Sequence, residues 1–169
     1  MRKVILAKFL IATTVGTALA IVAGVFWRRW RKAQLAAKRQ LAMLDLTQEL
    51  EGGQSQLGAD FLQAASTTGK PRGLAWKQVE LHKEAAFATD RVTGELYAMI
   101  DATVSFTAIE GGGMEHVEAV SNLRSATAVF VHRQGSWATD GRVVFNLNPQ
   151  QAVEHYQESL ELVQPIPNS

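Results

Sequence analysis

The longest uninterrupted run of apolar residues lies near the N-terminus. Residues 9–27 read FLIATTVGTALAIVAGVFW, which is 19 residues without a charged side chain. An α-helix of this length, rising about 1.5 Å per residue, spans about 28 Å and so matches the ~30 Å hydrocarbon core of a bilayer. The run is apolar on every side, which is unlike a helix that covers a soluble core. We therefore predict a transmembrane helix over residues 9–27, preceded by a short basic tail at 1–8.

A cleaved signal peptide is the main alternative, because Ala18, Leu19 and Ala20 fit the small-residue cleavage pattern. The apolar run continues for six residues beyond Ala20, so cleavage there would leave a hydrophobic terminus. Aromatic and basic residues then follow, as is typical of a membrane interface: Trp27, Arg28, Arg29, Trp30, Arg31 and Lys32. We therefore predict an uncleaved signal anchor.

Small side chains recur every four residues along this predicted helix and share one face: Ala12, Gly16, Ala20 and Gly24. Such a face lets two helix backbones approach closely in lipid, where no hydrophobic force draws helices together. The pattern predicts lateral packing against a second copy or against another membrane protein. The alternative is chance repetition, because Ala and Gly are common in membrane helices.

The pattern changes after residue 27. Residues 28–51 are rich in Ala, Leu, Gln, Lys and Glu, all good helix formers, and contain neither Gly nor Pro. The membrane helix is therefore predicted to continue as a basic juxtamembrane stalk, which ends at Gly52. Residues 52–73 mix Gly, Ser, Thr and Gln, and are predicted to be a linker with a short helix within 59–65.

From residue 74 the hydrophobic period falls to two, which predicts β-strands. The alternation is clearest in residues 95–109, where even-numbered apolar positions alternate with odd-numbered, mostly polar ones. Three further strands are predicted at 76–89, 115–131 and 137–147, joined by Gly-rich turns. A final helix begins at Asn148, a suitable N-cap followed by Pro149, and continues to residue 163. Residues 74–163 therefore predict an α+β domain with a four-stranded antiparallel meander, its helices on one face, and residues 164–169 a flexible tail.

Charge is distributed unevenly along the chain. Residues 1–39 hold nine of the 17 Lys and Arg residues and no acidic residue, so the remainder has eight basic against 16 acidic side chains. A basic segment beside a membrane attracts anionic lipid headgroups, whereas the acidic remainder argues against a nucleic-acid partner. Six Lys and Arg residues follow the apolar run and three precede it, which favours a cytoplasmic C-terminal side. The opposite orientation stays open, because the short basic tail also resists export. The absence of cysteine excludes disulfides and thiolate chemistry.

Motifs for chemistry are absent from the sequence. The four histidines fall in no metal-binding spacing, and there is no nucleophile elbow, C-x-x-C pair or phosphate-binding loop. We predict no catalytic residue, no metal ligand and no cofactor. The one candidate pocket lies on the polar face of the predicted sheet, at His82, Tyr97 and Asp101; the alternative is that these side chains lie on a solvated surface.

Together these patterns favour a single-pass membrane protein whose non-catalytic α+β domain serves as an accessory, scaffold or assembly subunit. Its expected partners are the bilayer and another membrane protein or a second copy of the chain. Two other functions stay open. One is a ligand-binding or enzymatic domain with its pocket on the polar face of the sheet. The other is a binder of anionic lipid surfaces that uses the basic residues after the apolar run.

Overall fold

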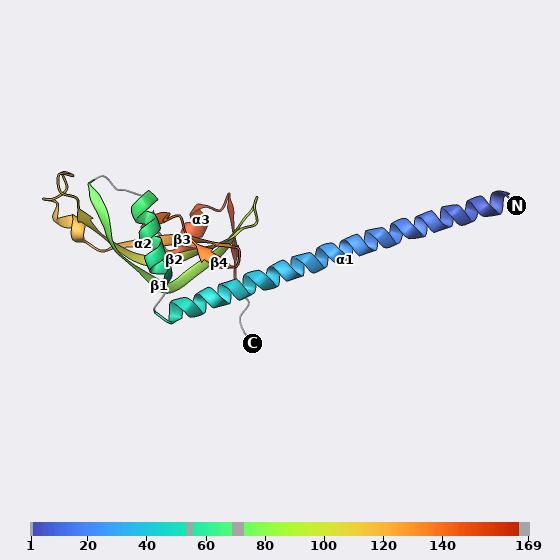
Figure 1. Ribbon diagram of the computed structural model, residues 1–169, viewed down its shortest axis with the longest axis horizontal. Coiled ribbons are helices and arrows are strands. Elements are labelled where there is room, and N and C mark those ends of the chain that lie inside the picture. Colours follow the sequence, from blue (N-terminus) through green and yellow to red (C-terminus); the bar gives the residue numbers. More distant parts are fainter. Residues whose placement is uncertain (1, 54–55, 69–72, 166–169) are drawn as a thin grey trace. The chain divides into compact units, whose positions relative to one another are not determined.

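The computed structural model describes the backbone of residues 2–53, 56–68 and 73–165, and the side chains of these ranges from residue 22 onward. The chain divides into two compact units, Met1–Arg39 and Gln40–Ser169, and each is described by itself. Figure 1 labels most of the elements of both units.

The N-terminal unit consists of helix. α1 (Arg2–Glu51) runs through this unit and into the next without interruption, and ends where the Gly52 amide donates to the carbonyl of Gln48 at 3.1 Å. Among the residues that the structure describes, no helix combines the length and the apolar content needed to cross a membrane. The side chains of residues 1–21, and with them Ala12, Gly16 and Ala20 of the predicted packing face, lie outside the described residues. Gly24 lies within them and has open space where a Cβ would stand.

The C-terminal unit is built on one antiparallel sheet, so the α+β class predicted from the sequence is confirmed. The sheet has six strands rather than the predicted four, in the spatial order β4-β3-β2-β1-β6, with β5 also paired to β3. In chain order the strands are β1 (Leu74–Asp90), β2 (Leu96–Ala108), β3 (Arg124–Arg133), β4 (Ser136–Ala138), β5 (Val143–Phe145) and β6 (Leu160–Val163).

Two predicted strands are interrupted. Residues 139–142, around Asp140 and Gly141, leave the ladder inside the segment predicted as one strand at 137–147. Its two halves become β4 and β5, which pair with the same strand β3 in the same direction but in shifted register. The segment predicted as a strand at 115–131 begins instead with a short 3-10 helix, η1 (Glu118–Ser121), and β3 starts only at Arg124.

The C-terminal helix is shorter than predicted. Its start is as expected, because the Asn148 side chain accepts from the Gln151 amide at 2.9 Å and the Gln151 side chain accepts from the Asn148 amide at 3.1 Å. However, α3 (Pro149–His155) ends at Tyr156, whose carbonyl accepts from the Leu160 amide across a turn at 2.8 Å. The chain then returns as β6, which takes up the backbone groups at the edge of β1.

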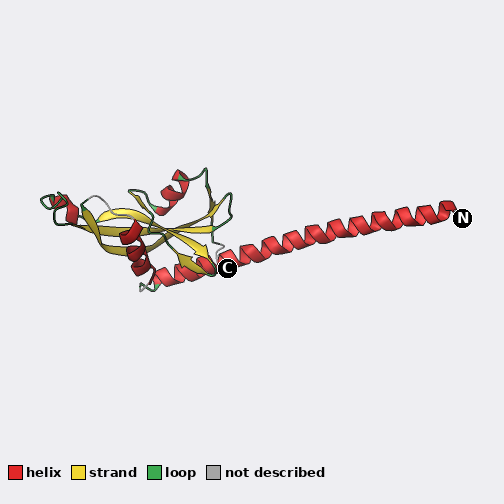
Figure 2. Ribbon diagram, turned by 45° about the horizontal axis from the view of Figure 1, so that its top comes forward, coloured by secondary structure: helices red, strands yellow, loops and turns green. Residues whose placement is uncertain are grey.

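Helices cover both faces of the sheet, not one as predicted (Figure 2). On the first face, the last turns of α1 and α2 (Gln56–Thr68) pack on the even-numbered residues of β2. The side chains that these helices bury are Ala42, Met43, Leu46, Leu50, Leu57, Phe61 and Ala65. On the second face, Ala152 and Val153 of α3 pack beside Met99 and Val129. The second, smaller cluster leaves part of its face uncovered, and the candidate site lies there.

The outer edge of β1 is paired over only part of its length. β6 pairs with its last residues, Phe87 to Asp90, and no other strand of the described sheet joins this edge. The register of β1 against β2 shifts twice, between Trp76 and Gln78 and between Leu81 and Ala85. Such irregularities are β-bulges, which bend a strand locally.

Candidate functional site

Two adjoining clefts open on the face of the sheet that carries α3, with volumes of about 280 and about 150 Å³. Both are lined by Tyr97, Val129 and Arg142, and we call them the Tyr97 clefts. The larger cleft extends toward the turn after α3 and reaches Tyr156 and Leu160. The smaller one extends toward Arg133 and the turn between β4 and β5.

The floor of the larger cleft is apolar because of the alternation in β2. Even-numbered residues of this strand enter the main core, so Tyr97 and Met99 face the α3 side. Val129 stands opposite Met99 in the register of β3 against β2, and Leu160 joins them from β6. Met99, Val129 and Leu160 are all buried, and they form a hydrophobic base with a polar rim.

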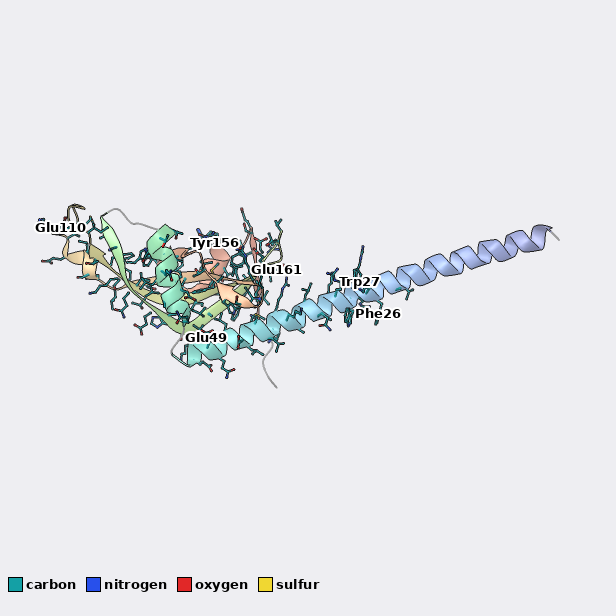
Figure 3. The ribbon with its side chains drawn as sticks, viewed as in Figure 1. Phe26, Trp27, Glu49, Glu110, Tyr156 and Glu161 are labelled. Atoms are coloured by element: carbon teal, nitrogen blue, oxygen red, sulfur yellow. The ribbon has the colours of Figure 1, made fainter. Side chains whose placement is uncertain are left out.

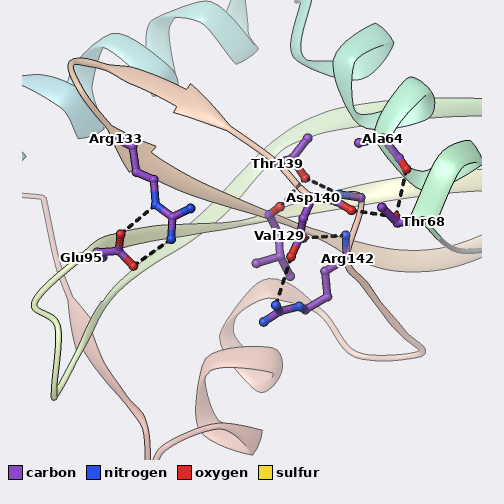
Figure 4. A network of polar contacts seen from close by, with 9 residues as sticks. Ala64, Thr68, Glu95, Val129, Arg133, Thr139, Asp140 and Arg142 are labelled. Carbon is purple, nitrogen blue, oxygen red and sulfur yellow. Dashed lines mark hydrogen bonds and ion pairs between the residues drawn. The ribbon is translucent and has the colours of Figure 1, made fainter.

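The turn that carries Arg142 is held by its own side chains (Figure 4). We call residues 139–142 the Asp140 turn. The Thr139 hydroxyl donates to the carbonyl of Val129 at 2.8 Å and accepts from the Gly141 amide at 3.0 Å. The Asp140 carboxylate accepts from the Arg142 amide and from its guanidinium, each at 3.1 Å. The guanidinium therefore stands beside the Asp140 carboxylate on the exposed rim.

The Asp140 turn also contacts α2, through a hydrogen bond and a close backbone approach. The Thr68 hydroxyl donates to the carbonyl of Asp140 at 2.8 Å. Gly141 has a φ of 78° and lies directly against the backbone of Ala64 and Ala65, where a Cβ would overlap main-chain atoms. Glycine alone satisfies both the left-handed conformation and this close approach. The end of α2 on one face thus positions the rim of the clefts on the other.

An ion pair borders the smaller cleft. The Arg133 guanidinium donates two hydrogen bonds to the Glu95 carboxylate, at 2.7 and 3.1 Å. These hydrogen bonds lower the pKa of the Glu95 carboxyl. Burial, and next the negative charge of Glu95, raise the pKa of the Tyr97 phenol above its ordinary value. Tyr97 is therefore a neutral phenol at physiological pH, and hydrogen bonding from its hydroxyl also lowers the pKa of the Glu95 carboxyl.

The structure does not bring the three predicted pocket residues into one cleft. Tyr97 lines both Tyr97 clefts, whereas His82 and Asp101 line neither. The His82 ring nitrogen Nε2 lies 2.8 Å from the Thr103 hydroxyl on the neighbouring strand. Asp101 is half-buried on β2, opposite Thr127 of β3. The described residues contain no group of three or more His, Asp or Glu side chains that could hold a metal ion.

Sequence reasoning missed the other lining residues. Arg142 follows the Asp-Gly pair at 140–141, which signals a turn but not what the turn faces. Tyr156 and Leu160 fit the apolar stripe of a longer helix, so their placement after α3 was not apparent. Val129 belongs to a predicted strand whose register depends on distant pairing.

The predicted membrane-interface residues lie on the exposed part of α1. All side chains from Val22 to Lys38 are exposed, including the two tryptophans, and Figure 3 labels Phe26 and Trp27 on this helix. The guanidinium carbon of Arg31 lies 4.8 Å from the centre of the Trp27 ring, a cation–π contact.

Comparison with known proteins gives no relative: the chain matches no family model, no curated protein and no solved structure.

Acid is expected to destabilise the C-terminal unit through Asp90. Its carboxylate accepts from the amides of Thr93 and Val92 in the β1–β2 turn, and these bonds lower its pKa. A depressed folded-state pKa stabilises the fold above the unfolded value, and this contribution is lost as pH falls through the folded value. We expect the urea midpoint to fall as the pH is lowered from about 5 through the depressed folded-state pKa of Asp90. Asp90→Asn, which keeps the acceptor oxygen without the charge, should show a smaller fall; an equal fall would contradict this account.

Proposed function

We propose that the chain is a single-pass membrane protein, anchored by residues 9–27, whose C-terminal unit is a non-catalytic module that docks a partner protein in the Tyr97 clefts. It would act as an accessory, scaffold or assembly subunit. The observation that carries the docking site is the composition of the clefts, in which a buried apolar floor is bordered by Tyr97, Tyr156 and Arg142. Tyr and Arg are enriched among the residues that dominate binding energy at protein interfaces.

The charge of the rim supports a protein segment as the occupant. The larger Tyr97 cleft, at about 280 Å³, has room for one large apolar side chain. Arg133 is paired with Glu95, and Arg142 with Asp140, so these two arginines do not create a strong site for a free anion. They can still donate further hydrogen bonds to the backbone of a docked segment.

The exposed aromatic and basic residues that follow the apolar run support the membrane anchor. Trp27 and Trp30 are each more than half exposed, and cations surround them. Aromatic side chains beside Lys and Arg are typical of the end of a membrane helix. The excess of cations after the run favours a cytoplasmic C-terminal unit. The small-residue face from Ala12 to Gly24 would supply a second contact, with a helix of the partner or of another copy.

The anchor and the docking site are tested by separate measurements on the full-length protein. Alkaline carbonate should leave the protein in the membrane pellet if residues 9–27 span the bilayer. Capture in mild detergent, followed by mass spectrometry, should recover a stoichiometric partner. Tyr97→Ala and Arg142→Ala should each reduce that recovery at least about tenfold, the effect of losing an interface hot spot.

Lys83→Ala is the matched control, because Lys83 is an exposed cation of β1 outside the Tyr97 clefts. It should recover the partner as the parent protein does. Circular dichroism should show that all three variants are folded. Undiminished recovery with both cleft variants would exclude the Tyr97 clefts as the docking site.

A further inference from the structure

Six cations follow the apolar run within a short length of helix: Arg28, Arg29, Arg31, Lys32, Lys38 and Arg39. We call residues 28–39 the basic collar. No acidic residue precedes Asp45, so the first four cations of the collar have no carboxylate within four positions on the helix. Along α1 the collar extends for about 16 Å. This local excess of positive charge attracts an anionic surface.

The cations of the collar spread around about half of the helix circumference. At about 100° per residue, Val22, Phe26, Trp30, Ala33 and Ala37 fall along one side of α1, which carries no charge. Arg28, Lys32 and Arg39 fall on the other half, with Arg31 and Lys38 at one margin and Arg29 at the other, beside Val22. Exposed Val25 and Leu35 lie among these cations. Phe26 and Trp30 are 72% and 54% exposed.

We propose that the basic collar is a binding site for anionic phospholipid headgroups. The cations of the collar pair with lipid phosphates, while Phe26 and Trp30 enter the boundary between headgroups and acyl chains. Clusters of Lys and Arg next to a membrane helix bind anionic headgroups in this way, and aromatic side chains lie at the same interface. The inference rests on the proposed membrane anchor, and it names the lipid that the anchor selects.

The stacked pair at the start of the collar fits this role. Arg31 lies over the ring of Trp27, which places a planar guanidinium beside an aromatic side chain at the expected level of the interface. A guanidinium stacked in this way keeps its N–H groups at the edge, where they can donate two parallel bonds to one phosphate. Lys38 and Arg39 stand about 10 Å farther along the helix, within about one Debye length of the lipid charges at 0.1 M salt.

The apolar side chains next to the collar favour a lipid surface over nucleic acid, the other common polyanion. The collar follows directly on the uncharged run at 9–27, and Phe26, Trp27 and Trp30 stand at the junction. A lipid surface offers acyl chains to these side chains, whereas the phosphate backbone of a nucleic acid does not. The collar and the side chains beside it therefore fit a bilayer with anionic headgroups above a hydrocarbon interior.

The test uses the full-length protein in liposomes of phosphatidylcholine that contain about one-fifth brominated lipid, either phosphatidylglycerol or phosphatidylcholine. Bromine quenches nearby tryptophan fluorescence. The variant Trp27→Phe/Trp30→Phe retains only Trp76 and Trp137. The fluorescence of Trp27 and Trp30 is therefore obtained by subtracting the fluorescence of this variant from that of the parent protein, and we call the difference the collar signal. We expect brominated phosphatidylglycerol to quench this signal at least about threefold more than brominated phosphatidylcholine at low salt, and 1 M salt to remove the difference.

Matched charge variants assign the effect to the collar. Arg28→Gln/Arg31→Gln/Lys32→Gln should abolish the preference for phosphatidylglycerol. Lys77→Gln/Lys83→Gln/Arg124→Gln, which removes three exposed cations of the C-terminal unit, should retain it. Equal quenching by both lipids in the parent protein would overturn the proposal. Tight binding of a mixed-sequence RNA that displaces the lipid preference would also overturn it.

Failure of the anchor is distinguishable from failure of the collar. Extraction by alkaline carbonate would refute the anchor, and flotation would then decide the lipid proposal. The extracted protein should float with phosphatidylglycerol vesicles and not with phosphatidylcholine vesicles if the collar binds anionic lipid. Flotation with neither kind of vesicle would overturn the collar proposal.

Discussion

Gly141→Ala is expected to lower the free energy of unfolding by about 3 kcal/mol, because it combines two separate penalties. The residue has a φ of 78°, a conformation that L side chains rarely adopt. An added Cβ would also overlap the backbone of Ala64 and Ala65 in α2, forcing the Asp140 turn away from that helix. The displaced turn would lose the bond from the Thr68 hydroxyl as well. Urea unfolding followed by circular dichroism measures the loss.

Gly135→Ala is the matched control for this prediction. Gly135 has a similar φ of 89°, but nothing lies within 4 Å of the position that its Cβ would take. This variant carries the conformational penalty alone, about 1 kcal/mol. Equal losses for Gly135→Ala and Gly141→Ala would show that the close approach of the Asp140 turn to α2 is not a stabilising feature.

Phe61→Ala is expected to cost about 4 kcal/mol, the usual consequence of removing a fully buried phenyl ring. Phe61 is completely buried, and its ring centre lies 6.1 Å from that of Trp76 and 5.9 Å from that of Phe130. It thus joins α2 to β1 and β3 at one point. We do not expect the cavity left by alanine to collapse, because the strands beneath it belong to one hydrogen-bonded sheet. The shift in the urea midpoint of the full-length protein gives the magnitude.

Leu62→Ala on the same helix separates loss of the core from loss of helix formation. Leu62 is only half-buried, so its truncation should cost about 1 kcal/mol, while the change in helix propensity is small. A cost for Phe61→Ala no greater than that for Leu62→Ala would mean that α2 does not pack on the sheet as described.

The local sequence pattern was sufficient to predict an element where its two sides differ strongly in hydrophobicity or where a helix cap marks its start. β2 was predicted within one residue of its observed ends, because its even positions enter the core and its odd positions face the other side. The start of α3 was predicted from Asn148 and Pro149, whose effect on a helix is also local. β6 was missed because Leu160 and Val163 fit an apolar helical stripe as well as a strand. Only the edge of β1, at least 70 positions away in the chain, decides between the two.

The difference between local patterns and long-range pairing also explains which residues of the candidate site could be predicted. Tyr97 was selected because it stands on the less apolar side of a clear strand. His82 and Asp101 were grouped with it by that alternation alone, and the structure places them outside the Tyr97 clefts. Arg142 and Tyr156 reach the clefts from a turn and from the end of α3. Their proximity depends on how β3, α2 and β6 come together, and no short pattern in the sequence records that.

The incomplete pairing of β1 has a consequence for solubility. An unpaired strand edge can recruit the same edge of another molecule and start an extended aggregate, a hazard that grows where proteins are concentrated. The two register shifts in β1 interrupt the straight row of backbone groups that such stacking requires. Lys77, Glu80, Lys83 and Glu84 add charge along the same stretch, and all four are exposed. A flat apolar strand edge would promote association. Residues 74–86 are instead irregular and charged, which opposes pairing between the sheets of neighbouring copies.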